Sequence, residues 1–240
     1  MTARGQAPAL GLFHRLAVLP EGGVRDLAAV RALAELTGEE GAQALEAALG
    51  LARHGSHEEA AAAWSLCRAV RPEAGLPYEV CQEIYRSARE LGLRAAALLL
   101  APPAQREAPA PQAPRDDLSL GHRRMLARSA RSERLARLGA DQDPRVTVEL
   151  LKNPRLTERE VLRLASHRPA RAEVLTAIAD SPRWSTRLAV KSALARNPYS
   201  PPGLVMRFLP HLPAQLLAEI AEDGTLHVEL RRFARALLGG

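Results

Sequence analysis

The side chains that most often carry metal or acid–base chemistry are scattered through this sequence. Seven histidines are present, and none belongs to an HExxH pair. His54 and His57 are three residues apart, but they flank Gly55 and so need not share a helix face. We therefore expect histidines in solvated turns and no metal site. The seven are His14, His54, His57, His122, His167, His211 and His227.

Sequence motifs for nucleotide binding and nucleophilic catalysis are absent as well. The chain contains no GxSxG elbow, no P-loop and no GxGxxG fingerprint. Cys67 and Cys81 lie among apolar residues without an evident base partner, so they are interpreted as small packing residues. The sequence thus predicts a protein that is not an enzyme and that needs no cofactor.

Arginine is the residue type with the strongest case for binding. Residues 118–240 carry a net charge of +9, whereas residues 1–117 carry −3. If helical units stack in register, these arginines form a basic stripe that can grip carboxylates or phosphates. In the alternative interpretation they are solvated helix ends, partly paired with Glu149, Glu160 and Glu173. The candidate partner-binding residues are Arg163, Arg168, Arg171, Arg183, Trp184 and Arg187.

The elements that must position these residues are predicted to be helices. Alanine and leucine fill most apolar positions, and aromatic residues make up only 3% of the chain, which disfavours strands. Residues 101–117 contain five prolines and are expected to form an extended linker. We predict an all-α protein with a tail over residues 1–23, a helical module over 24–100, this linker, and a second helical module over 118–240.

The first module has clear helix boundaries. Helices are expected over residues 24–36, 37–54, 56–71, 78–91 and 94–100, with capping boxes at the starts of the second and third, where Thr37 precedes Glu40 and Ser56 precedes Glu59. The helix after Gly55 places Ala60, Trp64, Cys67 and Pro72 in a small, large, small, proline order. On these residues, the stretch over roughly 40–100 resembles tetratricopeptide repeats, which implies stacked helix pairs with a groove for partners.

The second module contains a repeated order of signals. Pro144-Arg145 and Pro182-Arg183 each open an expected helix, and Asn153-Pro154 and Asn197-Pro198 each end one. Asp143 is expected to cap the first of these helices, while Thr157 and Ser200 can cap the helices that follow the stops. On this order, residues 119–238 resemble the leucine-rich repeat variant and the related HEAT-like solenoids. The resemblance implies an α-solenoid with a binding role.

A catalytic alternative rests on Trp184. HEAT-like DNA glycosylases use tryptophans and an aspartate on a basic concave face, and Asp180 lies four residues before Trp184. The Ser181-Pro182 break separates these two residues, however. The competing interpretation is a tryptophan that packs between helices or stacks on arginine side chains.

These patterns together favour an adaptor that binds a protein partner, one with an acidic patch, through a helical-repeat surface. The alternatives are a nucleic-acid-binding protein that uses the basic second module and, more remotely, a glycosylase-like enzyme. The most apolar run, residues 91–102, is too short to cross a membrane and contains Arg94. We expect a cytoplasmic protein.

Overall fold

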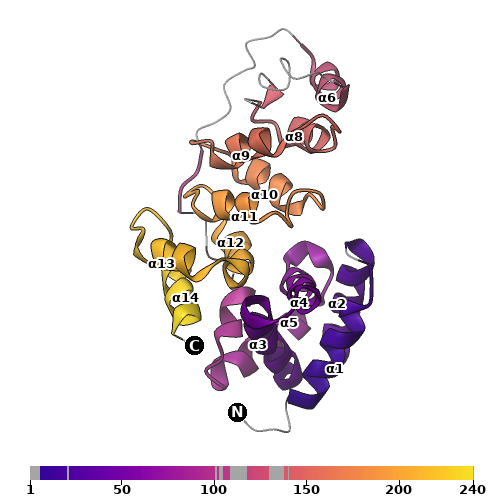
Figure 1. The fold of residues 1–240 in the computed structure, drawn as a ribbon, viewed down its shortest axis with the longest axis vertical. Coiled ribbons are helices and arrows are strands. Elements are labelled where there is room, and N and C mark those ends of the chain that lie inside the picture. Colours follow the sequence, from indigo (N-terminus) through magenta and orange to yellow (C-terminus); the bar gives the residue numbers. More distant parts are fainter. Residues whose placement is uncertain are drawn as a thin grey trace. The chain divides into compact units, whose positions relative to one another are not determined.

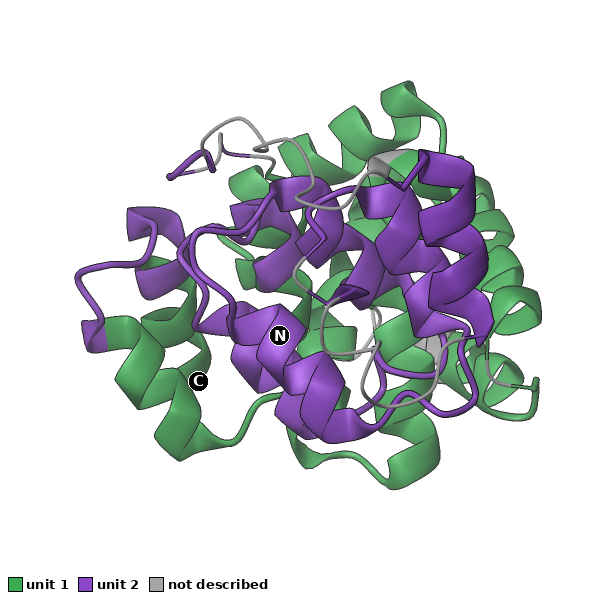
Figure 2. Cartoon of the chain, turned by 90° about the horizontal axis from the view of Figure 1, so that it is seen from above, with its two compact units in different colours: residues 1–101, 206–221, 232–240 green, residues 102–205, 222–231 purple. Residues whose placement is uncertain are grey.

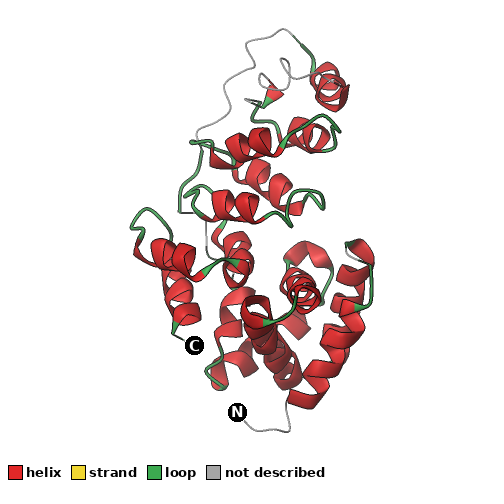
Figure 3. Cartoon of the chain, viewed as in Figure 1, coloured by secondary structure: helices red, strands yellow, loops and turns green. Residues whose placement is uncertain are grey.

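The described part of the chain is entirely helical. The computed structural model describes residues 6–20, 22–100, 102, 105–108, 118–129, 138–139 and 141–239. Within these ranges the regular elements are α-helices and short 3₁₀ helices, and there is no strand (Figure 3). The all-α prediction is therefore confirmed. No helix of these ranges is both long enough and apolar enough to span a membrane.

The chain forms two compact units (Figure 2). Unit 1 comprises Met1–Ala101, Met206–Ala221 and Arg232–Gly240, and unit 2 comprises Pro102–Val205 and Glu222–Arg231. The first crossing between the units falls at the start of the proline-rich stretch, most of which lies outside the described residues. The second predicted module, 118–240, is divided between the units because residues 206–221 and 232–240 belong to the same unit as the N-terminal helices.

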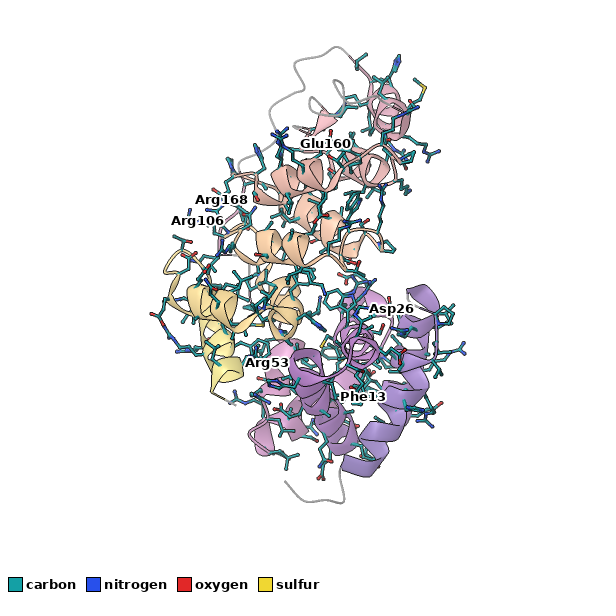
Figure 4. The ribbon with its side chains drawn as sticks, viewed as in Figure 1. Phe13, Asp26, Arg53, Arg106, Glu160 and Arg168 are labelled. Atoms are coloured by element: carbon teal, nitrogen blue, oxygen red, sulfur yellow. The ribbon has the colours of Figure 1, made fainter. Side chains whose placement is uncertain are left out.

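Unit 1 begins with a helix, α1, within the residues that were predicted to form a tail. Helix α1 contributes Leu12, Phe13 and Leu16, all buried, and it packs against α3 and α4 (Figures 1 and 4). Arg25 of α2 donates hydrogen bonds to the carbonyl oxygens of Ala17 and Leu19, which lie at the end of α1. The tail prediction for residues 1–23 is therefore wrong over α1. This unit contains α1 (Gln6–Ala17), α2 (Gly23–Glu35), α3 (Gly38–His54), α4 (His57–Ala69), η1 (Pro72–Ala74), α5 (Tyr78–Glu90), η2 (Arg94–Leu99) and η3 (Leu209–His211).

Helix α3 is the centre of unit 1, since it packs against both α4 and α5. Both predicted capping boxes are present, so Thr37 caps α3 and Ser56 caps α4. A Cβ at Gly41 would lie 2.8 Å from the Ile84 side chain, so glycine permits the close approach of α3 and α5. A short helix was predicted over residues 94–100 without a statement of its type. In the structure this segment is the 3₁₀ helix η2.

Unit 2 pairs helices that are two steps apart in the chain. Helix α6 packs against α8, α8 against α10, and α9 against α11. Asp143 caps α8 and Thr157 caps α9, as predicted. The described elements of this unit are α6 (Leu120–Ser129), α8 (Pro144–Leu151), α9 (Glu158–Ser166), α10 (Ala172–Asp180) and α11 (Leu188–Ala195).

One predicted helix start and one predicted cap in this region are wrong, whereas the helix expected after Ser200-Pro201 does begin, at Pro202. The helix expected at Pro182 begins only at Leu188, because Ser181 to Ser185 form a single turn in which the Ser185 amide bonds to the Ser181 carbonyl. Ser200 does not cap the next helix, because its hydroxyl donates to the Leu194 carbonyl at 2.7 Å. The chain continues through α12 (Pro202–Phe208), α13 (Ala214–Glu222) and α14 (Val228–Leu238), each of which includes residues of both units.

Candidate functional site

Trp184 was predicted to contact a partner, and the structure places it in the interior of unit 2. The residue is 1% exposed, and its indole nitrogen donates to the Leu151 carbonyl at 3.1 Å. A tryptophan held in this way offers neither ring face to a ligand. Trp184 is therefore a packing residue, and it cannot stack on a nucleobase in this conformation.

The arginines beside Trp184 are engaged within unit 2. The guanidinium carbon of Arg183 lies 4.4 Å from the centre of the indole ring, and that of Arg187 lies 5.1 Å away. Arg187 also pairs with Glu158. Arg183 donates to the carbonyls of the turn that follows α8: Asn153 at 2.9 Å, Leu156 at 3.2 Å and Pro154 at 3.4 Å.

The other three predicted residues do not join into one stripe. Arg168 donates to the Arg196 carbonyl at 2.6 Å, and Arg171 pairs with Glu173 at 3.0 Å (Figure 4 labels Arg168). Arg163 is exposed at the end of α9 and makes no hydrogen bond or ion pair with the described residues. The structure brings Arg183, Trp184 and Arg187 together, and it leaves the remaining three apart.

The two Asn-Pro turns have a shared structural role. Asn153 donates from its side chain to the Ala127 carbonyl at the end of α6. Asn197 donates in the same way to the carbonyls of Ala165 and His167 at the end of α9. Each asparagine also accepts from the amide two residues later. These side chains tie one turn to an earlier helix end, and so they set the spacing of successive helices.

A basic cluster lies next to the first of these turns. Glu149 of α8 is almost fully buried, yet three exposed cations contact its carboxylate. Arg128 makes the closest contacts, at 2.7 and 2.9 Å, while Lys152 lies at 3.4 Å and Arg124 at 3.5 Å. We call these four residues the Glu149 cluster. Its cations outnumber its one carboxylate, so the cluster carries a net positive charge.

The basic surface extends from the Glu149 cluster to Arg155 and Arg183. Arg155 is exposed and donates to the Ser129 carbonyl, beside Arg128. Arg183 is also exposed and reaches the backbone between Lys152 and Arg155. Among the described residues, Glu149 is the only carboxylate that these five cations contact. The tips of exposed cations that have so few counter-ions can bind external carboxylates or phosphates.

Only part of this surface was found from the sequence. Arg183 was among the predicted residues, whereas Arg128, Lys152 and Arg155 were not. A usable signal is present in the repeat: a basic residue precedes the asparagine in both turns, as Lys152 and as Arg196. The position of α6 beside α8, which supplies Arg124 and Arg128, depends on tertiary packing and has no local signal.

The Glu149 carboxylate should make the stability of unit 2 sensitive to acid. The hydrogen bond from Arg128 lowers the pKa of Glu149 from its ordinary value of 4.5, and the positive charge of Lys152 adds to this effect although burial opposes it. Because the pKa is lower in the folded state, this stabilisation is fully present above pH 4.5 and is lost as the pH falls through the folded-state value. Glu149→Gln should lower the free energy of unfolding by about 1–2 kcal/mol at neutral pH.

Urea unfolding of the full chain between neutral pH and pH 3 measures this effect. The difference between wild type and Glu149→Gln should shrink as the pH falls below about 4.5. Glu107→Gln is the control, since Glu107 is exposed and makes no ion pair within the described chain. A difference that stays constant over the whole range would rule out this role for Glu149.

The described residues contain no cluster of three or more histidine, cysteine, aspartate or glutamate side chains that could hold a metal ion. Comparison of the chain with models of protein families, with curated proteins and with solved structures gave no match. The resemblances to tetratricopeptide repeats and to the leucine-rich repeat variant therefore remain predictions.

Proposed function

We propose that this chain is a non-catalytic adaptor that binds an acidic segment of a protein partner on the basic surface of unit 2. The observation that carries the proposal is a group of five exposed cations, of which three contact one buried carboxylate, Glu149, and two donate hydrogen bonds only to backbone carbonyls among the described residues. Binding would replace solvent around these cations with carboxylates of the partner. The pairing of α8 with α10 and of α9 with α11 supports a scaffold of stacked repeats, which suits this role.

A short acidic segment fits this surface better than a nucleic-acid duplex does. The cations cluster around one turn, and the other predicted arginines are separate or engaged with Glu158 and Glu173. Tight binding to a duplex generally uses a longer series of phosphate contacts. Trp184 is buried, so it provides no stacking surface for single strands. Phosphate recognition by the same arginines makes nucleic-acid binding the second candidate.

Removing three cations of the Glu149 cluster should weaken binding of an acidic peptide. We expect the combined change Arg124→Gln, Arg128→Gln and Lys152→Gln to reduce affinity for a labelled oligoglutamate peptide about tenfold. This estimate takes roughly 0.5 kcal/mol for each exposed ion pair. Fluorescence anisotropy with the full chain measures the affinity, and labelled duplex DNA provides a parallel probe.

The matched control removes three exposed arginines of unit 1: Arg31→Gln, Arg86→Gln and Arg89→Gln. It changes the net charge equally, so its peptide affinity should stay within about twofold of the wild type, apart from screened long-range effects. If both triple variants lost the same peptide affinity, the loss would be due to net charge alone, and the proposed surface would be refuted. Duplex binding that persists near physiological salt would favour the second candidate.

A further inference from the structure

Two large apolar side chains are exposed beside the cations of the Glu149 cluster. Met125 of α6 is 57% exposed, and Val148 of α8 is 39% exposed. Met125 directly follows Arg124 in the chain, and Val148 directly precedes Glu149. Because Arg124 pairs with Glu149 across the two helices, both apolar residues lie next to residues that are in contact (Figure 1 shows α6 beside α8). The basic surface therefore includes apolar side chains.

The exposed residues of α8 form a single stripe that places an apolar residue between two cations. From Arg145 to the C-cap Lys152, the exposed residues are Arg145, Val148 and Lys152. Their spacing of three and four residues puts them on one face of the helix. The residues between them are buried, so they belong to the packed side of α8. Arg145 pairs with Asp143 and Lys152 with Glu149, and Val148 lies between these two ion pairs.

Helix α6 presents a similar arrangement. Arg124 and Arg128 are four residues apart, and both contact Glu149. Met125 precedes Arg128 by three residues, so the two side chains are neighbours on the exposed side of the helix. Ala127, which lies on the opposite side, is buried. Each of the two helices thus places one exposed apolar side chain beside the cations that contact Glu149.

We infer that the segment bound by this surface combines acidic side chains with aliphatic ones, and that Met125 and Val148 contact the aliphatic ones. This inference rests on the proposed adaptor function, since the same cations hold the acidic side chains. A purely acidic segment would lay polar groups over Met125 and Val148 and gain nothing from covering them. Aliphatic side chains gain free energy by removing this apolar surface from water. Methionine and arginine are both enriched in protein–protein interfaces.

A protein segment fits this mixture of side chains better than a nucleic acid or a membrane does. The backbone of a nucleic acid offers phosphates to Arg145 and Lys152 but no aliphatic group to Val148 between them. Helices that lie on membranes bury a wide apolar face in the lipid. Met125 and Val148 are instead separate apolar residues on two short helices, with cations on either side of Val148.

Two labelled peptides of equal length and equal charge test the inference on the full chain. One contains leucines at intervals among glutamates, and the other contains serine at the same positions. We expect the leucine peptide to bind about tenfold more tightly by fluorescence anisotropy, because its side chains bury apolar surface. Equal affinities would overturn this inference while leaving the acidic-segment proposal intact. If neither peptide bound, both would be overturned.

Polar substitutions of similar shape locate the contact. The combined change Met125→Gln and Val148→Thr should weaken binding of the leucine peptide about fivefold or more, and should change the affinity for the serine peptide less than about twofold. The matched control is Val24→Thr with Leu27→Gln, at exposed apolar positions of α2 in unit 1, and it should leave both affinities unchanged. Wild-type affinity of the Met125→Gln and Val148→Thr variant for the leucine peptide would refute the assignment.

Other occupants of the surface would give different results. Sedimentation of the chain without peptide should show no association that depends on Met125 and Val148. A dimer that is lost in the Met125→Gln and Val148→Thr variant would identify a second copy of the chain as the occupant and overturn the inference. Tighter binding to vesicles of phosphatidylserine and phosphatidylcholine than to the leucine peptide would overturn it in favour of a membrane surface.

Discussion

Trp184→Ala is expected to lower the stability of unit 2 by about 3–5 kcal/mol, the range for removal of a large aromatic side chain from a core. The indole is 1% exposed, so its loss leaves a cavity that the short helices around it cannot fill completely. The substitution also removes the donor to the Leu151 carbonyl and the ring on which Arg183 and Arg187 lie. Urea unfolding followed by circular dichroism measures the loss.

Trp184→Phe is the informative control for this substitution. It retains most of the buried ring but cannot donate to Leu151, so its effect should be about 1–3 kcal/mol. The second tryptophan, Trp64, lies in unit 1, and its fluorescence reports on that unit once Trp184 has been replaced. A loss below about 1 kcal/mol for Trp184→Ala would mean that this side chain is not buried in solution.

Asn197→Ala should have the second largest effect, a loss of about 2–4 kcal/mol. Asn197 is 1% exposed and makes three hydrogen bonds through its side chain, to Ala165, His167 and Tyr199. Alanine would leave buried carbonyls without donors, at about 1–3 kcal/mol for each group that stays unsatisfied. Hydrogen exchange should show faster opening at the end of α9 than in the wild type, with little change in α3 of unit 1.

Asn197→Asp tests the polarity of these bonds. The aspartate keeps an acceptor for the Tyr199 amide but places a carboxylate against two carbonyl oxygens, so it should be at least as destabilising as alanine at neutral pH. Protection at α9 that equals the wild type in both variants would show that Asn197 does not tie the two turns together.

Local features of the fold were predictable from the sequence. The capping boxes at Thr37 and Ser56 and the cap at Asp143 depend on residues within three positions, and all are present. Helix α1 was missed, because its apolar positions are interrupted by His14 and Arg15 and its burial depends on contacts with α3 and α4.

The candidate site was less predictable than the fold. Arginines were identified as the residues of interest, but their partners come from other helices. Arg183 contacts a turn some thirty residues earlier, and Arg128 contacts Glu149 across two helices. The indole of Trp184 likewise donates to the Leu151 carbonyl, 33 residues earlier, and no spacing in the sequence predicts that contact. The charge and type of a residue can be taken directly from the sequence, whereas the groups that each arginine contacts depend on how the helices pack.

The return of residues 206–221 and 232–240 to unit 1 has a consequence for biosynthesis. Trp64 cannot meet Phe208 until the whole of Pro102–Val205 has left the ribosome, so the core of unit 1 stays open while unit 2 is being made. During that interval the apolar surface around Trp64 is available to chaperones and to other nascent chains. A fragment that ends within the proline-rich stretch would remain permanently in this unfinished state, and would be prone to aggregate for that reason.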